Sequence, residues 1–267
     1  MNKNCVLCEG LKDEFKNIKS FYPKLQNSVT LFETKNFKII PDKFPLTDNH
    51  IIIIPKNHIN TFAEFNNIEA EEIGYILDKL ENITKAKSFI MFEHGTSKNT
   101  ESNTPAHIKS IFHAHLHFIP NIKCTTEDMK EFFKNKDVNL LDSNNKQLDI
   151  FNFETTYKGN YNLIDFIRNN VIYEDKEKKS VESYFYIKNS NNTQLFFPER
   201  IVTPQIPSQF LREALSKQCN TPEWNWKLPL TENGHITYEK RMIKMNNLFK
   251  SSNSNIISQI LTKLKER

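Results

Sequence analysis

The segment from Ile111 to Pro120 reads Ile-Phe-His-Ala-His-Leu-His-Phe-Ile-Pro, so three histidines stand at alternate positions of an otherwise apolar run. This alternation predicts a β-strand, because successive side chains of an extended chain point to opposite faces of a sheet. His113, His115 and His117 are then expected on one face, with roughly 6.5 to 7 Å between neighbours. That spacing suits three adjacent side chains with separate tasks, while the alternate apolar residues should face a core.

The sequence up to this segment predicts an α+β domain. A continuous β-branched run is closed by Pro55, as expected for a strand buried on both faces. An amphipathic helix follows, with Asn66 or Asn67 as its cap. The order of elements predicts an antiparallel sheet of about five strands with a helix packed on one face. Strands are expected at residues 29–33, 37–40, 51–54, 88–93 and 111–120, and the helix at 68–85.

Charge and composition limit the classes of function. The 267-residue chain has a net charge of +4, which suits small anionic substrates but gives no basic stripe for duplex nucleic acid. It shows neither a long apolar window nor a signal-peptide pattern at its start, so a soluble cytoplasmic protein without a membrane partner is expected. Four cysteines, two of them in Cys-x-x-Cys, favour a metal site over a disulfide framework.

Three blocks of this sequence resemble the histidine-triad (HIT) superfamily. Residues 113–119 are similar to its signature of three histidines alternating with apolar residues. The segment from Asp42 to His58 is similar to Asp-x-x-Pro followed by x-His, four apolar residues and Pro-Lys-x-His. Residues 5–8, Cys-Val-Leu-Cys, stand where many members carry Cys-x-x-Cys. The blocks follow the family order within residues 5–120, which is less than half of the chain, and the predicted sheet and helix agree with the HIT fold.

The resemblance implies a nucleotide hydrolase or nucleotidyl transferase that acts on nucleoside phosphoramidates, phosphate esters or dinucleoside polyphosphates. The reaction would pass through a nucleotidyl-histidine intermediate on His115, since a neutral imidazole is a nitrogen nucleophile able to attack phosphorus. His117 and Ser110 would bind the phosphate and the leaving group. Asp42 would accept hydrogen bonds from the ribose hydroxyls. Plain structural roles stay open for Ser110, ahead of a strand, and for Asp42, at the start of a turn.

The Cys-x-x-Cys pair predicts a zinc site. Two thiolates and two imidazoles complete a tetrahedral Cys₂His₂ centre. The resemblance implies that Cys5 and Cys8 are joined by His58 and His113, with zinc in a structural role. An unmetallated thiol pair is the alternative. A second alternative is a catalytic metal held by the histidine strand itself.

The sequence departs from the family pattern just before the triad. Typical members have Asn-x-Gly and then Gly-Gln, whereas this chain has Glu93-His94-Gly95, a polar stretch at 96–107, and Ile108-Lys109-Ser110. Lys109 would replace the glutamine amide by a point charge. His94 is either an additional acid or base, or an ordinary loop histidine. These differences affect the identity of the substrate more than the identity of the nucleophile.

The rest of the chain predicts further α+β structure. We divide the sequence into a HIT domain at 1–122, a linker at 123–160 and an α+β accessory region at 161–267. A hairpin is expected at 182–197, with helices at 163–167, 207–215 and 238–249.

This carboxy-terminal region is loosely similar to the one that follows the HIT-like domain in CwfJ-type proteins. The alternative function is therefore an RNA-associated binding protein with little hydrolase activity, although the triad here is complete. Arg200, Arg212 and Lys227 would contact RNA phosphate or simply be surface charges, and Trp224 and Trp226 suit a core better than a base-stacking platform. The nucleotide is the expected small-molecule partner, and a homodimer is possible because many HIT proteins form one.

Overall fold

The computed structural model describes residues 5–25, 28–97, 111–156, 163–171, 173–175, 180–204, 209–225 and 228–265. The described helices are α1 (Val6–Asp13), α2 (Lys16–Phe21), α3 (Asn67–Thr84), α5 (Thr126–Asn135), α6 (Leu163–Asn170), α7 (Phe210–Gln218) and α8 (Glu232–Lys265), with 3₁₀ turns η1 (Phe62–Glu64), η2 (Ile150–Phe153) and η3 (Glu199–Ile201). The described strands are β1 (Phe32–Glu33), β2 (Phe37–Pro41), β3 (Ile51–Pro55), β4 (Phe89–Gly95), β5 (Leu116–Pro120), β6 (Asn139–Leu140), β7 (Glu154–Thr156), β8 (Tyr173–Asp175), β9 (Ser180–Val181), β10 (Tyr184–Asn189), β11 (Thr193–Pro198) and β12 (Val202–Thr203).

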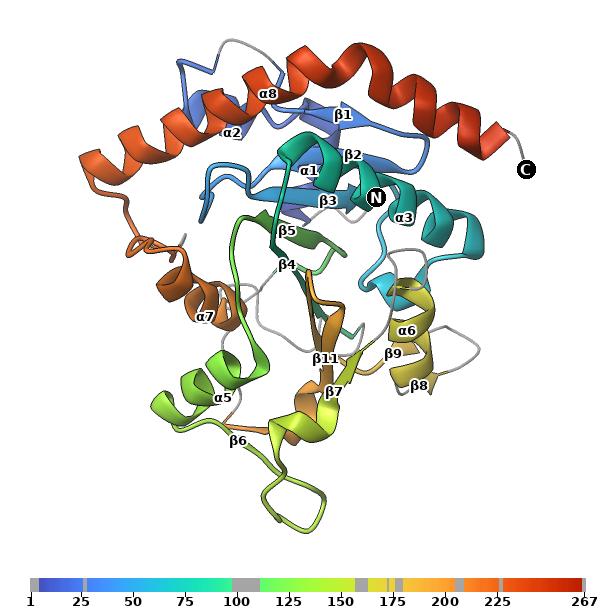
Figure 1. Cartoon of the computed structure of the whole chain (residues 1–267), viewed down its shortest axis with the longest axis vertical. Coiled ribbons are helices and arrows are strands. Elements are labelled where there is room, and N and C mark those ends of the chain that lie inside the picture. The colour runs from blue at the N-terminus through green and yellow to red at the C-terminus, as the bar shows by residue number, and fades with distance from the viewer. Residues whose placement is uncertain are drawn as a thin grey trace.

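An eight-stranded antiparallel sheet forms the centre of the molecule, in the order β1-β2-β3-β5-β4-β10-β11-β7 (Figure 1). Its first five strands are those expected from the sequence, and the fold class α+β is confirmed. The strand count of about five was too small, because β4 does not end the sheet. Tyr184 of β10 pairs with Gly95 of β4, and Asn189 pairs with Ile90, so the β10–β11 hairpin continues the ladder.

Helix α3 begins where the capping signal predicted. The Asn66 side chain accepts from the backbone N–H of Glu69 at 2.9 Å, and the Glu69 carboxylate accepts from the N–H of Asn66 at 2.9 Å, which is a reciprocal capping box. The predicted inner face packs on the sheet: Ile73, Ile76, Leu77 and Leu80 are fully buried, with Ile83 packed against them.

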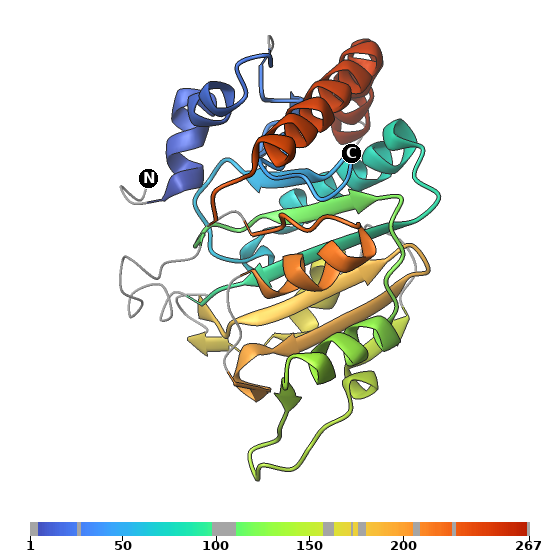
Figure 2. The ribbon, with the colours of Figure 1, turned by 90° about the vertical axis from the view of Figure 1, so that its left-hand side faces the viewer.

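The sheet is covered on both faces because alternate residues of its strands are apolar on each side. On β10, Tyr184 and Tyr186 pack toward α3 and α6, whereas Phe185 and Ile187 pack toward α5 and α7. Figure 2 shows α5 and α7 in front of the sheet. At β2 and β3, the sheet face that α5 and α7 cover farther along is covered by α1, α2 and the start of α8. The face with the alternate apolar residues of the histidine run, Ala114, Leu116 and Phe118, lies in the α3-side core as predicted.

The predicted linker and accessory region share this sheet with the amino-terminal part. The hairpin expected at 182–197 is confirmed as β10 and β11, and α7 and α8 lie in the expected places, although 205–208 are outside the described residues. The boundaries near residues 122 and 160 remain a prediction, as does a homodimer.

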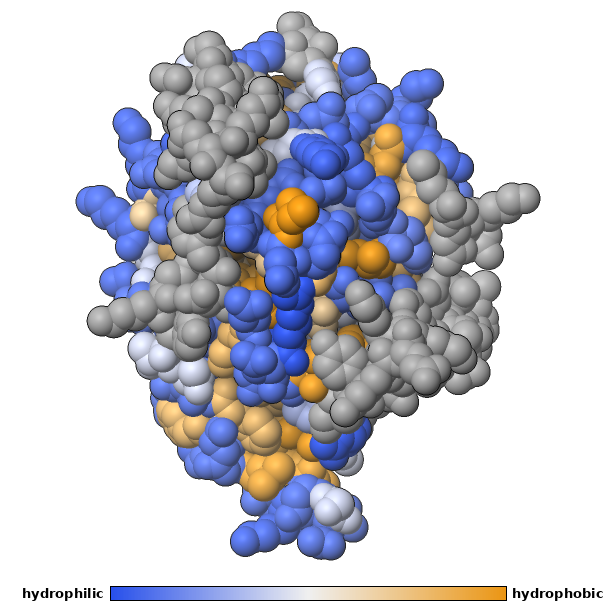
Figure 3. Space-filling view, turned by 90° about the vertical axis from the view of Figure 1, so that its right-hand side faces the viewer, coloured by the Kyte–Doolittle hydropathy of each residue, from blue (hydrophilic) through white to orange (hydrophobic). Residues whose placement is uncertain are grey.

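The outer surface opposite α5 and α7 is mostly hydrophilic, with apolar side chains gathered toward the lower end of the view (Figure 3). In the part of the chain that the structure describes, no helix is both long and apolar enough to cross a bilayer.

Candidate active site and metal centre

The histidine run is not one regular strand. Strand β5 begins at Leu116, so only His117 of the three histidines lies in the sheet. His113 leaves the ladder because its Nε2–H donates to the carbonyl oxygen of Pro55 at 2.9 Å. In the same segment, the backbone N–H of Ala114 donates to the carbonyl oxygen of Ile59 at 2.7 Å. The rings of His115 and His117 are consequently 5.1 Å apart between centroids, closer than a continuous strand would place them.

His115 is held in one tautomer. Its Nδ1–H donates to the carbonyl oxygen of His113 at 2.7 Å, which leaves Nε2 with a lone pair. Burial, followed by the nearby His117, lowers the pKa of His115 to about 3. The ring is therefore neutral near pH 7, and its available nitrogen is an acceptor or a nucleophile rather than a donor.

His117 has the opposite tautomer, and a backbone amide determines it. The N–H of Leu46 donates to Nδ1 of His50 at 3.1 Å, so the proton of His50 must lie on Nε2. This Nε2–H donates to Nδ1 of His117 at 2.9 Å, so His117 carries its own proton on Nε2. Burial lowers the pKa of both imidazoles, which keeps the pair neutral. The relay from Leu46 through His50 makes His117 a hydrogen-bond donor beside the lone pair of His115.

Two aromatic stacks fix side chains on β4 and β5. The Phe92 ring lies parallel to that of His117, with centroids 4.3 Å apart and 7° between planes. His94 stacks on Phe185 at 4.2 Å, and its Nε2 lies 3.5 Å from a carboxylate oxygen of Glu199. His94 is thus a strand residue rather than the loop histidine that the sequence left open.

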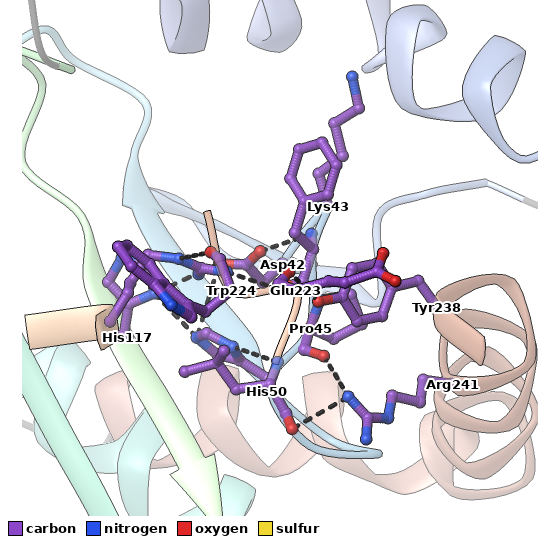
Figure 4. Close-up of polar contacts among 12 residues, drawn as sticks. Asp42, Lys43, Pro45, His50, His117, Glu223, Trp224, Tyr238 and Arg241 are labelled. Atoms are coloured by element: carbon purple, nitrogen blue, oxygen red, sulfur yellow. Dashed lines mark hydrogen bonds and ion pairs between the residues drawn. The ribbon is translucent and has the colours of Figure 1, made fainter. Parts of the chain in front are cut away.

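Asp42 lies beside the histidine pair at the end of β2. Its Oδ1 accepts from the N–H of Phe44 at 2.7 Å, and its Oδ2 accepts from Nη1 of Arg212 at 2.7 Å. The same Oδ2 lies 3.4 Å from Nδ1 of His117 and 3.6 Å from Nε2 of His50 (Figure 4). Burial opposes ionisation of Asp42, but Arg212 and the two histidines outweigh it and hold its pKa well below the usual value.

His115, His117 and Asp42 line a cavity of about 420 Å³, a size that accommodates a small ligand such as a nucleotide. Most of its wall is apolar and comes from α1, α2, β2, β3 and β4. The polar side chains that line it are Asn17, Asp42, Lys43, His94, His115, His117 and Arg212. Lys43 points away from Asp42 and His117 (Figure 4), with its Nζ 4.4 Å from the centre of the Phe21 ring. The cavity therefore offers cationic or donor groups at separate places on an apolar wall.

A second cluster brings together the four predicted metal ligands. Their ligand atoms all lie within 4.8 Å of one another. Nδ1 of His113 is 3.5 Å from both sulfurs, and Nδ1 of His58 is 3.3 Å from Sγ of Cys8. Zinc bonds of about 2.3 Å to sulfur and about 2.0 Å to nitrogen give roughly 3.5 Å between ligand atoms at a tetrahedral angle.

The residues of this cluster also fit zinc in their protonation. Because His113 donates its Nε2–H to the Pro55 carbonyl, its Nδ1 is the lone-pair nitrogen that faces Cys5 and Cys8. Four protein ligands leave no open coordination position, which is the arrangement of a structural site.

The structure brings most predicted site residues to two places. His115, His117 and Asp42 line the cavity, and Cys5, Cys8, His58 and His113 form the metal cluster. Ser110 and Lys109 are outside the described residues. The roles assigned to these residues stay predictions.

The sequence predicted no role in this site for either His50 or Arg212. The family spacing around His50 was a usable signal for the relay, because it puts a histidine directly before a central strand. No local pattern connects Arg212 with Asp42, which is 170 residues away.

Comparisons with known proteins agree on the amino-terminal part. A family model described as "Scavenger mRNA decapping enzyme C-term binding" matches residues 16–131. An uncharacterized HIT-like protein of Saccharolobus solfataricus is 28% identical over 96 residues, 36% of this chain and 66% of that protein, slightly under two thirds of its length. An uncharacterized HIT-like protein of Chlamydia trachomatis is 32% identical over 92 residues, 33% of this chain and 77% of the relative.

Among solved structures, a HIT family protein from Bacillus anthracis aligns with 51% of this chain and 97% of its own, at 17% identity and a TM-score of 0.33. The likeness of the carboxy-terminal region to CwfJ-type proteins stays a prediction. Since 77% of the Chlamydia relative is covered at 32% identity, with the triad and its neighbouring blocks in place, this chain belongs to the HIT superfamily.

Proposed function

We propose that this protein is a nucleotide hydrolase or nucleotidyl transferase that forms a covalent intermediate on His115. The observation that carries the proposal is the hydrogen bond from Nδ1–H of His115 to the carbonyl of His113. It leaves Nε2 with its lone pair, on a residue that lines a cavity of nucleotide size. An imidazole nitrogen in this state is the nucleophile that phosphoryl or nucleotidyl transfer requires.

The first step forms a bond between Nε2 of His115 and the α-phosphorus of the substrate. The bond from phosphorus to the leaving group breaks, and the leaving group departs with its electron pair and takes up a proton from solvent where its basicity demands one. In the second step water or another acceptor attacks phosphorus, the phosphorus–nitrogen bond breaks, and His115 recovers its lone pair. One difficult displacement is thereby divided into two easier ones.

His117 supplies the stabilising donor in this proposal. Because its Nδ1 accepts from His50, its Nε2–H is free to donate to a non-bridging phosphate oxygen, on which charge accumulates during attack. The parallel Phe92 ring restricts the imidazole to one orientation. A donor fixed in advance costs no reorganisation when the charge develops.

We also propose that Cys5, Cys8, His58 and His113 hold one zinc ion. The spacing of the four ligand atoms and the tautomer of His113 support this assignment. Zinc would act there as a structural crosslink between the start of α1, the segment after β3 and the segment before β5. The chemistry at His115 does not need it.

The RNA-associated alternative gains no support from the described residues. Arg212 is buried against Asp42, and Arg200 pairs with Glu182 at 2.8 Å. Trp224 packs against the apolar core on the α5 and α7 side.

The test is turnover of adenylyl and guanylyl phosphoramidates, aryl phosphate esters and dinucleoside polyphosphates by wild type and His115→Ala. We expect nucleotide release by wild type and a loss of at least about 10³-fold in the variant. A substrate made chiral at phosphorus should react with overall retention of configuration, because two in-line displacements invert twice. Inversion, or equal rates in both proteins, would refute a covalent intermediate on His115.

A further inference from the structure

Arg212 connects the carboxy-terminal region to the candidate active site. It lies on α7, whereas Asp42 lies at the end of β2, and their side chains are each only 6% exposed. Nη1 of Arg212 donates to Oδ2 of Asp42 at 2.7 Å, and Nη2 donates to the Phe44 carbonyl at 2.6 Å. Nε points to the carbonyl of Trp224 at 3.4 Å. The planar guanidinium is therefore held on three sides.

The positive charge of Arg212 stabilises the ionised carboxylate of Asp42, which is buried beside two neutral imidazoles. An isolated buried carboxylate would take up a proton or draw one onto a neighbour, because burial disfavours the charged form. With Arg212 in contact, Asp42 stays ionised without charging His50 or His117. A lysine would supply the charge but not the fork that also reaches the Phe44 carbonyl.

Both oxygens of Asp42 contact the protein. Oδ1 accepts from the backbone of Phe44, and Oδ2 faces Arg212 and the two histidines. An ionised carboxylate has further lone pairs for a ligand in the cavity. The observed contacts therefore give Asp42 a role within the histidine network in addition to the ribose contact expected from the sequence.

We propose that Arg212 is a positioning residue of the active site: it fixes Asp42, whose negative charge, 3.6 Å from Nε2 of His50, favours the proton on that nitrogen and so the tautomer of the pair that presents the His117 donor. The carboxy-terminal region thus completes the site. The reaction affected is the one proposed above, so this inference rests on that function for its kinetic consequences but not for its structural ones.

Removing the guanidinium of Arg212 should change the protonation of the two histidines directly. The charged and titratable groups around Asp42 and the histidine pair are Tyr22, His115, Tyr238 and Arg241, in addition to Arg212. Arg212 lowers the pKa of His117 and His50, whereas Asp42 raises it. In Arg212→Met the carboxylate is left facing the pair, so a proton is expected on His117 at a higher pH than in wild type.

The experiment compares wild type, Arg212→Met, Arg212→Lys and a matched control, Arg241→Met. Arg241 of α8 holds the same loop through the carbonyls of Pro45 and Leu46 but does not touch Asp42. Nitrogen-15 NMR of labelled histidine, without substrate, reports tautomer and protonation, and steady-state kinetics reports kcat and KM.

For Arg212→Met we expect a changed His117 signal with a raised pKa. We expect kcat to fall about 10²-fold, with KM within about threefold, and partial recovery in added guanidinium. Arg212→Lys should lie between wild type and Arg212→Met, and Arg241→Met should keep the wild-type His117 signal.

Unchanged histidine signals together with unchanged kcat in Arg212→Met would overturn the inference. If Arg212→Met does not fold, the double variant Asp42→Asn/Arg212→Met removes both charges together and should fold. Wild-type kcat in that double variant would also overturn the inference. A wild type without turnover would sink the proposed function alone, because the NMR comparison needs no substrate.

Discussion

At the scale of single residues, the state of each histidine is determined by its hydrogen-bond partners. The Leu46 amide assigns the proton of His50, His50 assigns that of His117, and the His113 carbonyl assigns that of His115. One backbone N–H and one backbone C=O thus make two neighbouring imidazoles chemically different, one a hydrogen-bond donor and one with a lone pair.

The relay predicts the behaviour of His50→Phe, which keeps a ring but removes both nitrogens. In this variant Nδ1 of His117 would lose the hydrogen bond from His50. The proton of His117 would then move from Nε2 to Nδ1 and donate to Asp42, which leaves a lone pair on Nε2 facing the phosphate. We expect kcat to fall on the order of 10²-fold in turnover assays, the typical cost of one lost donor. The orphaned Leu46 N–H should also destabilise the fold by about 1 to 3 kcal/mol in denaturant unfolding. Wild-type kcat in a folded variant would show that the relay is unimportant.

Glu93 predicts a pH dependence of stability. It is fully buried, accepts from Tyr184 Oη at 2.5 Å and from the Phe62 N–H at 3.1 Å, and burial raises its pKa from 4.5 to about 8. The folded state therefore keeps a proton that the unfolded state releases. The contribution of this proton to the free energy of unfolding is complete below pH 4.5 and is lost as the pH rises through about 8.

Glu93→Gln should remove this component. Between pH 4.5 and about 8, the unfolding free energy of wild type should therefore fall relative to that of Glu93→Gln, by at most about 1.4 kcal/mol per pH unit. Chemical denaturation at pH 5, 6, 7 and 8 measures this difference in unfolding free energy, which should change by roughly the same amount at each step. A difference that does not change with pH would contradict the assignment.

At the scale of elements, the sequence predicted β2, β3, β4 and α3 because each has a strong local pattern and local end signals. The sequence placed the start of β5 too early. His113 instead contacts the Pro55 carbonyl and the sulfurs of Cys5 and Cys8, which are distant in the sequence. The pairing of β10 with β4 was equally invisible, because an edge strand carries no mark of its partner.

The metal cluster joins three such elements, so its loss should loosen them together. Purified protein is expected to hold about one zinc per chain by elemental analysis, and Cys8→Ser to hold little and unfold at a lower temperature. Cys124→Ser is the matched control, because Cys124 is also a buried free thiol but lies outside the cluster. Equal zinc content in the two variants would exclude the assigned ligands.

At the scale of the whole molecule, one sheet and one ion-pair network cross from the amino-terminal to the carboxy-terminal part. Besides Arg212, α8 reaches the loop after β2 through Arg241, and Thr221 donates to the Leu46 carbonyl at 2.7 Å. The loop that carries the histidine relay is thus held by residues that follow it by more than 160 positions. Sequence patterns could not show this, since they record spacing and not spatial proximity.

This continuity predicts a single cooperative unfolding transition. The chain's two tryptophans, Trp224 and Trp226, both lie in the carboxy-terminal region, so their fluorescence reports on that part. Far-ultraviolet circular dichroism reports on the helices of both parts. We expect the two signals to give the same midpoint in guanidinium chloride. Separate midpoints would indicate two independently folding units.

The central claim, that His115 carries the nucleotide during turnover, has a direct measurement. Wild type and His115→Ala are mixed with adenylyl and guanylyl substrates, quenched within milliseconds to seconds, and weighed as intact chains. The account predicts a mass increase of one nucleoside monophosphate in wild type, located on His115 by peptide sequencing and absent from the variant. Turnover by wild type without any adduct, or the same adduct in His115→Ala, would contradict it.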